Sequence, residues 1–286
     1  MSNHRCCQDD SQGVMPMLLL IATQLLGLII ALGLTFNFLQ GETKMIDQLP
    51  LIARIILMEG SKGGTGKTTF MTSLAEWYKA NRVPIQLLDL DVENKNRGSL
   101  SHYFPGTPKI NINTPAGLDS FIDYALNGAS IILADMGGGA GQVTSRWFDQ
   151  MFQQVSEAGI AFTAVAMVTS DPASVESCLH WASMIQTRAN FLVVRNSTEF
   201  QPNFDYWENT REAKEFVRVF DPKILDMNYR LAELQLATRN HGVTLGDVAD
   251  RKTAVPELKK GSLVMRAHAL RREIFEQLDK IKEILL

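Results

Sequence analysis

The chain has 286 residues, of which 45% are hydrophobic and 21% are charged, with 28 Lys and Arg residues against 31 Asp and Glu residues. This composition excludes a disordered or fibrous protein, and the formal net charge of -3 excludes a wholly basic protein that coats nucleic acid. The three cysteines, Cys6, Cys7 and Cys178, supply neither a disulfide framework nor the paired spacings of a zinc site. We therefore expect a protein of a reducing compartment.

The amino-terminal 44 residues differ in composition from the rest of the chain. No charged residue occurs from Ser11 to Gly41, and the apolar stretch at residues 17–38 reaches the length of about 20 residues that a bilayer-spanning helix needs. We expect residues 1–44 to form a tail with one transmembrane helix, and residues 45–286 to form a separate, soluble domain. The alternative is that the natural protein begins at Met45 and that the apolar stretch belongs to a misplaced gene start.

A glycine-rich loop lies near the start of the soluble domain. The β-branched run at residues 51–58 predicts a strand, and residues 70–80 have helical spacing, so the segment at residues 59–69 joins a strand to a helix. Glycines allow backbone N–H groups to approach phosphates, and the start of the helix adds the positive end of its dipole. In such a loop Lys67 neutralises the β- and γ-phosphates and the Thr68 hydroxyl holds Mg²⁺. The predicted phosphate-binding residues are Gly63, Gly64, Thr65, Gly66, Lys67, Thr68 and Thr69.

Two features of this loop point to a particular family. Ser61 stands where the strict phosphate-loop pattern has glycine, and Lys62 supplies a second lysine near the start of the loop. The segment from Lys62 to Thr68 resembles the deviant Walker A motif of the ParA/MinD family of P-loop ATPases. The resemblance implies an ATP-dependent homodimer in which Lys62 reaches the phosphates bound by the partner subunit, so that Lys62 and Lys67 both act in catalysis. A glycine-rich turn that carries surface lysines is the structural alternative.

The next predicted strand, at residues 84–91, ends in two carboxylates. The carboxyl edge of a parallel sheet would place Asp89 and Asp91 beside the phosphate loop. The resemblance implies that Asp91 orients the attacking water and that Asp89 supports the Mg²⁺ shell. Taken alone, the pair is explained about as well by a helix cap or a turn.

A third apolar strand, at residues 131–135, ends in Asp135 and is followed by the glycines at positions 137–139. This is the layout by which a carboxylate reaches Mg²⁺ while the following loop moves with the γ-phosphate, so Asp135 is the predicted metal ligand. The family more often has a proline in that loop. A structural turn is the alternative.

Two later apolar runs, at residues 160–168 and 191–196, continue the alternation of strand and helix. We therefore expect an α/β fold with a mainly parallel sheet and helices on both faces. The family resemblance implies that Asn196, at the end of the last run, binds the adenine edge, although asparagine at a strand end is also a common turn residue. The choice of adenine over guanine depends on that resemblance alone.

Two charged helices have open interpretations. In the first, one helical face carries three basic residues that could contact DNA phosphates: Arg211, Lys214 and Arg218. The nearby Glu212 and Glu215 instead favour a solvated, salt-bridged helix. The amphipathic final helix, expected at residues 263–286, would lie on an anionic membrane or, more ordinarily, pack on the core of the domain.

These features predict an enzyme that binds MgATP and hydrolyses it as a dimer switch of the ParA/MinD type. Its cargo would be plasmid DNA or conjugation machinery, engaged with an unidentified activating or cargo protein. Residues 91–96 most resemble conjugative-transfer and plasmid-stability ATPases of the TraL/StbB kind. The ATPase domain would be cytoplasmic and anchored at the inner membrane by the amino-terminal helix, or free in the cytoplasm if translation starts at Met45.

Proteins of other classes compete with this interpretation. A nitrogenase-type iron protein would need cysteines to hold its iron–sulfur cluster, whereas the soluble domain has only Cys178. A membrane-anchored tyrosine kinase would usually end in a tyrosine cluster, whereas the last tyrosine of this chain is Tyr229. An ATP-dependent ligase or kinase acting on a small metabolite is the main alternative, and it would not require Lys62.

Overall fold

The computed structural model describes residues 52–58, 63–91, 98–128, 130–137 and 150–286. The predicted transmembrane segment at residues 17–38, the predicted boundary after residue 44 and the second loop lysine, Lys62, lie outside these ranges. Within the ranges, no helix combines the length and the apolar character that a membrane crossing requires.

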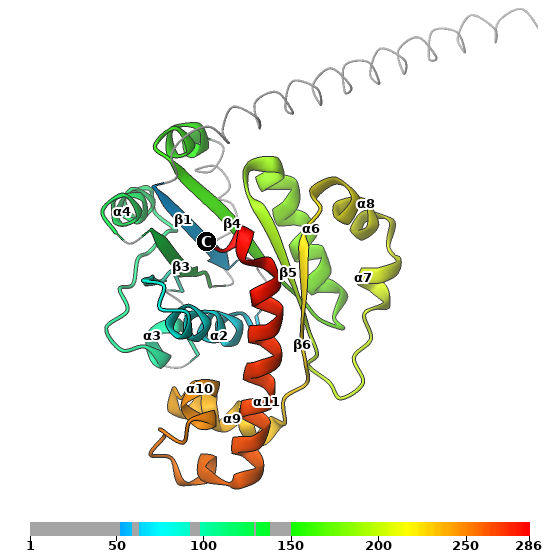
Figure 1. Cartoon of the computed structure of the whole chain (residues 1–286). Coiled ribbons are helices and arrows are strands. Elements are labelled where there is room, and N and C mark those ends of the chain that lie inside the picture. Colours follow the sequence, from blue (N-terminus) through cyan, green and yellow to red (C-terminus); the bar gives the residue numbers. More distant parts are fainter. Residues whose placement is uncertain (1–51, 59–62, 92–97, 129, 138–149) are drawn as a thin grey trace, which may run out of the picture. The chain divides into compact units, whose positions relative to one another are not determined.

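Six strands form a single sheet in the order β2-β3-β1-β4-β5-β6 (Figure 1). Every neighbouring pair is parallel, so the carboxyl ends of the strands lie along one edge. The prediction of a parallel α/β sheet is confirmed. The strands are β1 (Ala53–Met58), β2 (Gln86–Asp89), β3 (Ile131–Asp135), β4 (Ile160–Val168), β5 (Asn190–Asn196) and β6 (Lys223–Met227).

Helices cover both faces of the sheet, as the sequence predicts. Successive residues of β1 point to opposite faces. On one face, Ile56 and Met58 join an apolar core with α2 (Lys67–Ala80) and α11 (Gly261–Leu278). On the other face, Ile55 and Leu57 join a core with α4 (Pro115–Leu126), α6 (Pro172–Ile185) and α8 (Arg211–Phe220). All six residues of β1 are buried, which explains its continuous apolar sequence.

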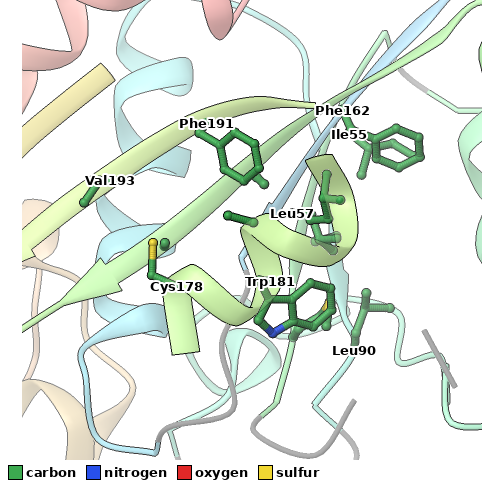
Figure 2. Packing of buried hydrophobic residues seen from close by; sticks show 14 of the residues in the cluster. Ile55, Leu57, Leu90, Phe162, Cys178, Trp181, Phe191 and Val193 are labelled. Atoms are coloured by element: carbon green, nitrogen blue, oxygen red, sulfur yellow. The ribbon is translucent and has the colours of Figure 1, made fainter. Parts of the chain in front are cut away.

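Figure 2 shows part of the α6 side of the core, where Cys178 and Trp181 of α6 lie beside side chains of β1, β4 and β5. Cys178 is buried as a thiol within this apolar cluster.

The carboxyl-terminal part of the chain adds a small helical unit below the sheet in Figure 1. We define this C-terminal helical unit as residues 232–270, which have a separate apolar cluster that includes Leu234, Val248 and Leu263. The remaining short elements are α3 (Leu100–Tyr103), η1 (Gln186–Arg188), α7 (Asp205–Asn209), α9 (Ala232–His241), α10 (Leu245–Ala249), η2 (Pro256–Lys259) and η3 (Asp279–Ile284).

The last residues of the chain pack on the core. Ile274 and Leu278 of α11 and Ile281 of η3 belong to the same apolar cluster as α2. Trp77 Nε1 of α2 donates a hydrogen bond to Asp279 Oδ1 at 3.1 Å, and the Tyr78 hydroxyl donates to the Leu285 carbonyl at 2.6 Å. Of the two uses expected for the final amphipathic helix, the described structure has the packed one.

The charged face of α8 carries an internal ion pair. Arg218 donates to Glu215 through Nε at 2.9 Å and also through Nη2, and both side chains are exposed. This pair supports the salt-bridged interpretation of α8, whereas contact with DNA stays a prediction.

Glu76 joins the loop helix α2 to the C-terminal helical unit. Its carboxylate accepts hydrogen bonds from the Thr244 hydroxyl and from the backbone N–H of Gly246, the latter at 2.9 Å. A Cβ atom on residue 246 would lie 2.1 Å from Glu76 Oε1, so only glycine allows this contact. The pKa of Glu76 is raised to about 7, chiefly by burial and also by Asp247, although the two hydrogen bonds and Arg271 favour the charged form.

We expect Glu76→Gln to change the pH dependence of stability. The folded protein holds the Glu76 proton more tightly than the unfolded chain does. The stability contributed by this group is therefore fully present below its usual pKa of 4.5, and it is lost as the pH rises through about 7. Between pH 4 and pH 8, the fall in the free energy of unfolding should be about 2 kcal/mol smaller in Glu76→Gln than in the wild type, as measured by urea denaturation. The exposed Glu157→Gln is the control, and an unchanged decline in the Glu76 variant would contradict the assignment.

Candidate functional site

The phosphate loop lies between β1 and α2 at the carboxyl edge of the sheet. Gly64 and Gly66 adopt left-handed backbone angles, with φ values of 79° and 95°, which glycine reaches without a steric penalty. Gly66 is the N-cap residue of α2, and no side chain caps this helix. Its first backbone N–H groups are therefore oriented to bind an anion.

Asn196, the last residue of β5, fixes the position of this loop. Its side-chain Nδ2 donates a hydrogen bond to the Thr65 carbonyl at 2.7 Å. A Cβ atom on residue 66 would lie 2.5 Å from the same nitrogen, so the close approach requires glycine. Asn196 Oδ1 is buried and has no hydrogen-bond partner among the residues that the structure describes. The structure thus gives Asn196 a loop-holding role that the sequence did not predict, and its contact with adenine stays a prediction.

Asp135 ends β3 and is buried, with 1% of its surface exposed. Neither carboxylate oxygen makes a hydrogen bond of good geometry with a described residue, although the Thr68 hydroxyl is close enough to favour the charged form. Burial raises the pKa of Asp135 to about 7, and the neighbouring Asp89 and Asp91 raise it too, whereas Thr68 and Lys67 lower it.

This arrangement fits a magnesium ion. Two buried carboxylate oxygens and a hydroxyl are hard oxygen donors of the kind that Mg²⁺ prefers, and Mg²⁺ in nucleotide sites usually takes only one or two protein ligands besides water and phosphate. Among the residues that the structure describes, no three His, Cys, Asp or Glu side chains gather into a metal cage.

Lys67 and Asp91 lie close to Asp135. Burial lowers the pKa of Lys67, while Asp135 and Asp91 favour its charged form, so all three groups share one electrostatic environment. Asp91 is buried and lies against Gly137, which follows β3. A Cβ atom on residue 137 would lie 2.5 Å from Asp91 Oδ1. Glycine at position 137 therefore allows the backbone there to contact the predicted water-orienting carboxylate.

Asp89 has a different environment from the one expected for a metal ligand. Its Oδ1 accepts a hydrogen bond from the Asp91 backbone N–H at 3.1 Å, and its Oδ2 accepts one from the Ser101 backbone N–H at 3.0 Å. Lys109 Nζ lies 3.4 Å from the same Oδ2 and also donates to the Asp91 carbonyl. Both oxygens thus hold the backbone on either side of residues 92–97, and Mg²⁺ support by Asp89 stays a prediction.

Sequence reasoning missed three contributors to the site. Lys109 and Ser101 reach Asp89 only because their segments fold back beside β2, and no local pattern marks them. β6 was missed because Lys223 and Asp226 interrupt its apolar residues, as is common in an edge strand.

The comparisons with known proteins were made at the level of sequence and of structure. No protein-family model and no curated protein sequence matches the chain. Similar solved structures include a chain of the MinC:MinD cell division protein complex of Aquifex aeolicus, with 14% identity, a TM-score of 0.49, and coverage of 81% of this chain and 96% of that one.

Two further similar structures contain a nucleotide. MinD of Pyrococcus horikoshii, complexed with Mg-ADP, has 13% identity and a TM-score of 0.48, and McdA of Cyanothece, complexed with ATP, has 13% identity and a TM-score of 0.47. Each comparison covers 82% of this chain and 98% of the other. These proteins are ParA/MinD-type ATPases, the family that the phosphate loop resembles. At such low identity, the chemistry of this site depends on the chain's own residues.

The contacts of Asp89 predict a structural effect of Asp89→Asn. The amide nitrogen would face the donors of Ser101 and Lys109, so the free energy of unfolding should fall by about 1–3 kcal/mol in chemical denaturation. If Asp89 acts only through these contacts, the loss of ATP affinity should be the same with Mg²⁺ and with EDTA. Lys109→Met, which removes the partner cation, should act in the same direction. Unchanged stability with a loss confined to Mg²⁺-dependent binding would instead make Asp89 a metal ligand.

Proposed function

We propose that residues 45–286 bind MgATP and hydrolyse it as an ATPase of the ParA/MinD type. The observation that carries this proposal is the buried carboxylate of Asp135, which lies next to Thr68 and Lys67 at the start of α2 and whose two oxygens have no hydrogen-bond partner in the described part of the chain. A carboxylate in that position is costly without a cation, and a bound metal ion removes the cost.

The loop would hold the polyphosphate. Backbone N–H groups from Gly63 to Thr69 bind the phosphate oxygens, and the ammonium group of Lys67 offsets the charge of the β- and γ-phosphates. Asn196 keeps this loop in place through Thr65. Thr68 and Asp135 would hold Mg²⁺, which supplies charge neutralisation at the β- and γ-oxygens when bound.

Asp91 would orient the water that attacks the γ-phosphorus, with ADP as the leaving group. Its burial against Gly137 and its closeness to Lys67 support this role, because both restrict the carboxylate to the phosphate end of the site. A fixed hydrogen-bond acceptor accelerates the step mainly by positioning the water.

The dimer and the cargo belong to the same proposal. Lys62 would cross to the partner's phosphates in an ATP-dependent homodimer, and the switch would position a cargo such as plasmid DNA or conjugation machinery through an activating protein, as in the TraL/StbB subgroup. The apolar stretch at residues 17–38 supports an inner-membrane anchor for a cytoplasmic ATPase domain.

A second candidate function, transfer to a small metabolite, is favoured by one observation. An open cavity of about 510 Å³ lies next to the segment that follows β4, at the same edge of the sheet as the phosphate loop. Its lining is Ser170, Pro172, Asn203, Asp205, Tyr206, Asn209 and Thr210. These neutral and acidic polar groups suit an uncharged or basic small molecule.

Lys67→Ala should lower MgATP affinity by about 100-fold, because it removes the side-chain cation from a loop otherwise built of backbone dipoles. Isothermal titration calorimetry measures this loss directly. Lys79→Ala is the matched control, since Lys79 is an exposed lysine at the far end of the same helix and should leave the affinity unchanged. Equal affinity in the two variants would rule out the phosphate-loop assignment.

Lys62→Ala should leave ATP binding by the monomer intact and abolish ATP-dependent dimerisation and hydrolysis, because its proposed target lies on the partner subunit. Analytical ultracentrifugation with a non-hydrolysable ATP analogue, together with a phosphate-release assay, tests both effects. A variant that dimerises and hydrolyses ATP normally would favour the small-metabolite enzyme.

A further inference from the structure

Arg230 is a buried cation without a charged partner among the described residues. It follows the end of β6 by three residues and has 4% of its surface exposed. Its Nη1 donates to the Met227 sulfur at 3.4 Å, and its Nε is buried with no hydrogen-bond partner in the described ranges. Burial lowers the pKa of Arg230 to about 10, a value at which the guanidinium is still charged at neutral pH.

Other arginines of the domain are satisfied differently. Arg54, which is also buried, donates to the Leu286 carbonyl at 3.2 Å and to the Thr163 hydroxyl at 3.3 Å. Arg195 forms a two-point ion pair with Asp226. A buried guanidinium whose one described acceptor is a weak thioether sulfur is unfavourable, so its charge is expected to serve something other than local packing.

A single side chain separates Arg230 from the phosphate loop. Met227 receives the hydrogen bond from Arg230 and pairs in register with Asn196, whose amide holds the Thr65 carbonyl. A Cβ atom on Gly66 would lie 3.4 Å from the terminal methyl of Met227. The chain of contacts therefore runs from the guanidinium through Met227 to the N-cap of α2.

The charge of Arg230 also reaches the metal side of the site. Both Arg230 and Asp135 act electrostatically on the Tyr103 hydroxyl of α3, with opposite signs. Asp89, Asp91 and Asp135 are buried at the same edge of the sheet, and such carboxylates repel a polyphosphate. A cation that solvent does not screen offsets this repulsion.

We propose that Arg230 is a buried counter-charge for the phosphates of the bound nucleotide, acting across Met227 without touching them. The inference rests on the proposed nucleotide site and deepens it. Arg230 would therefore act on the phosphates through its charge alone, as a positioning residue. Because the apolar Met227 lies between the charges, the effect should increase with the number of charges on the ligand and should persist in salt.

The test compares ATP with ADP by calorimetry in EDTA, where no Mg²⁺ offsets the phosphate charge and ATP carries one more negative charge than ADP. Arg230→Met should weaken ATP binding by about tenfold and ADP binding by less, so that the preference for ATP over ADP falls several-fold. Arg230→Lys, which keeps the charge, should retain the wild-type preference. Arg54→Met is the matched control: it removes a buried arginine from the amino end of β1 and should not change the preference.

Each outcome is decisive. An equal loss for both nucleotides in Arg230→Met, or a lost preference in Arg230→Lys, would make the role purely structural and overturn the inference. If Arg230→Met does not fold, as judged by circular dichroism, Arg230→Gln provides the same comparison of charge. A wild-type chain that binds neither nucleotide would instead refute the proposed function, which separates the two failures.

Discussion

The register of three parallel strands is the constraint on which the site depends. Met58 at the end of β1 pairs with Asp135 of β3, and Asp135 pairs with Asp89 of β2. The loop that follows β1 is thereby fixed beside two carboxylates from segments far apart in the sequence. A shift of one residue in either pairing would turn these side chains to the opposite face of the sheet, so the buried apolar pattern of the strands also determines the chemistry at their ends.

The loop is held from several sides by polar contacts that cross the core. Asn196 binds the Thr65 carbonyl from β5, Asp89 organises the backbone on either side of residues 92–97, and Glu76 ties the loop helix to the C-terminal helical unit. Through Asp89 and Glu76, α3 and the C-terminal helical unit are tied to the strand and the helix that flank the site.

Much of the fold and the central part of the site could be predicted from the sequence. Apolar runs that end in Asp135 and Asn196 gave strand boundaries within a residue of those observed, and the glycine-lysine loop located the start of α2. The roles of Asn196 and Asp89 could not be predicted, since their hydrogen-bond partners lie 131 and 12 residues away and are set by tertiary packing. Arg230 carries no motif at all, and only its burial beside Met227 distinguishes it from a surface arginine.

The central claim is that Asp135, Thr68 and the phosphate loop together bind a nucleotide with its metal ion. The most direct measurement is calorimetric titration of the full chain with ATP, once with Mg²⁺ and once with EDTA. The account predicts one ATP per chain and an affinity at least about tenfold higher with Mg²⁺, because the ion satisfies the two unpartnered oxygens of Asp135. No binding, or binding of equal affinity in EDTA, would contradict it.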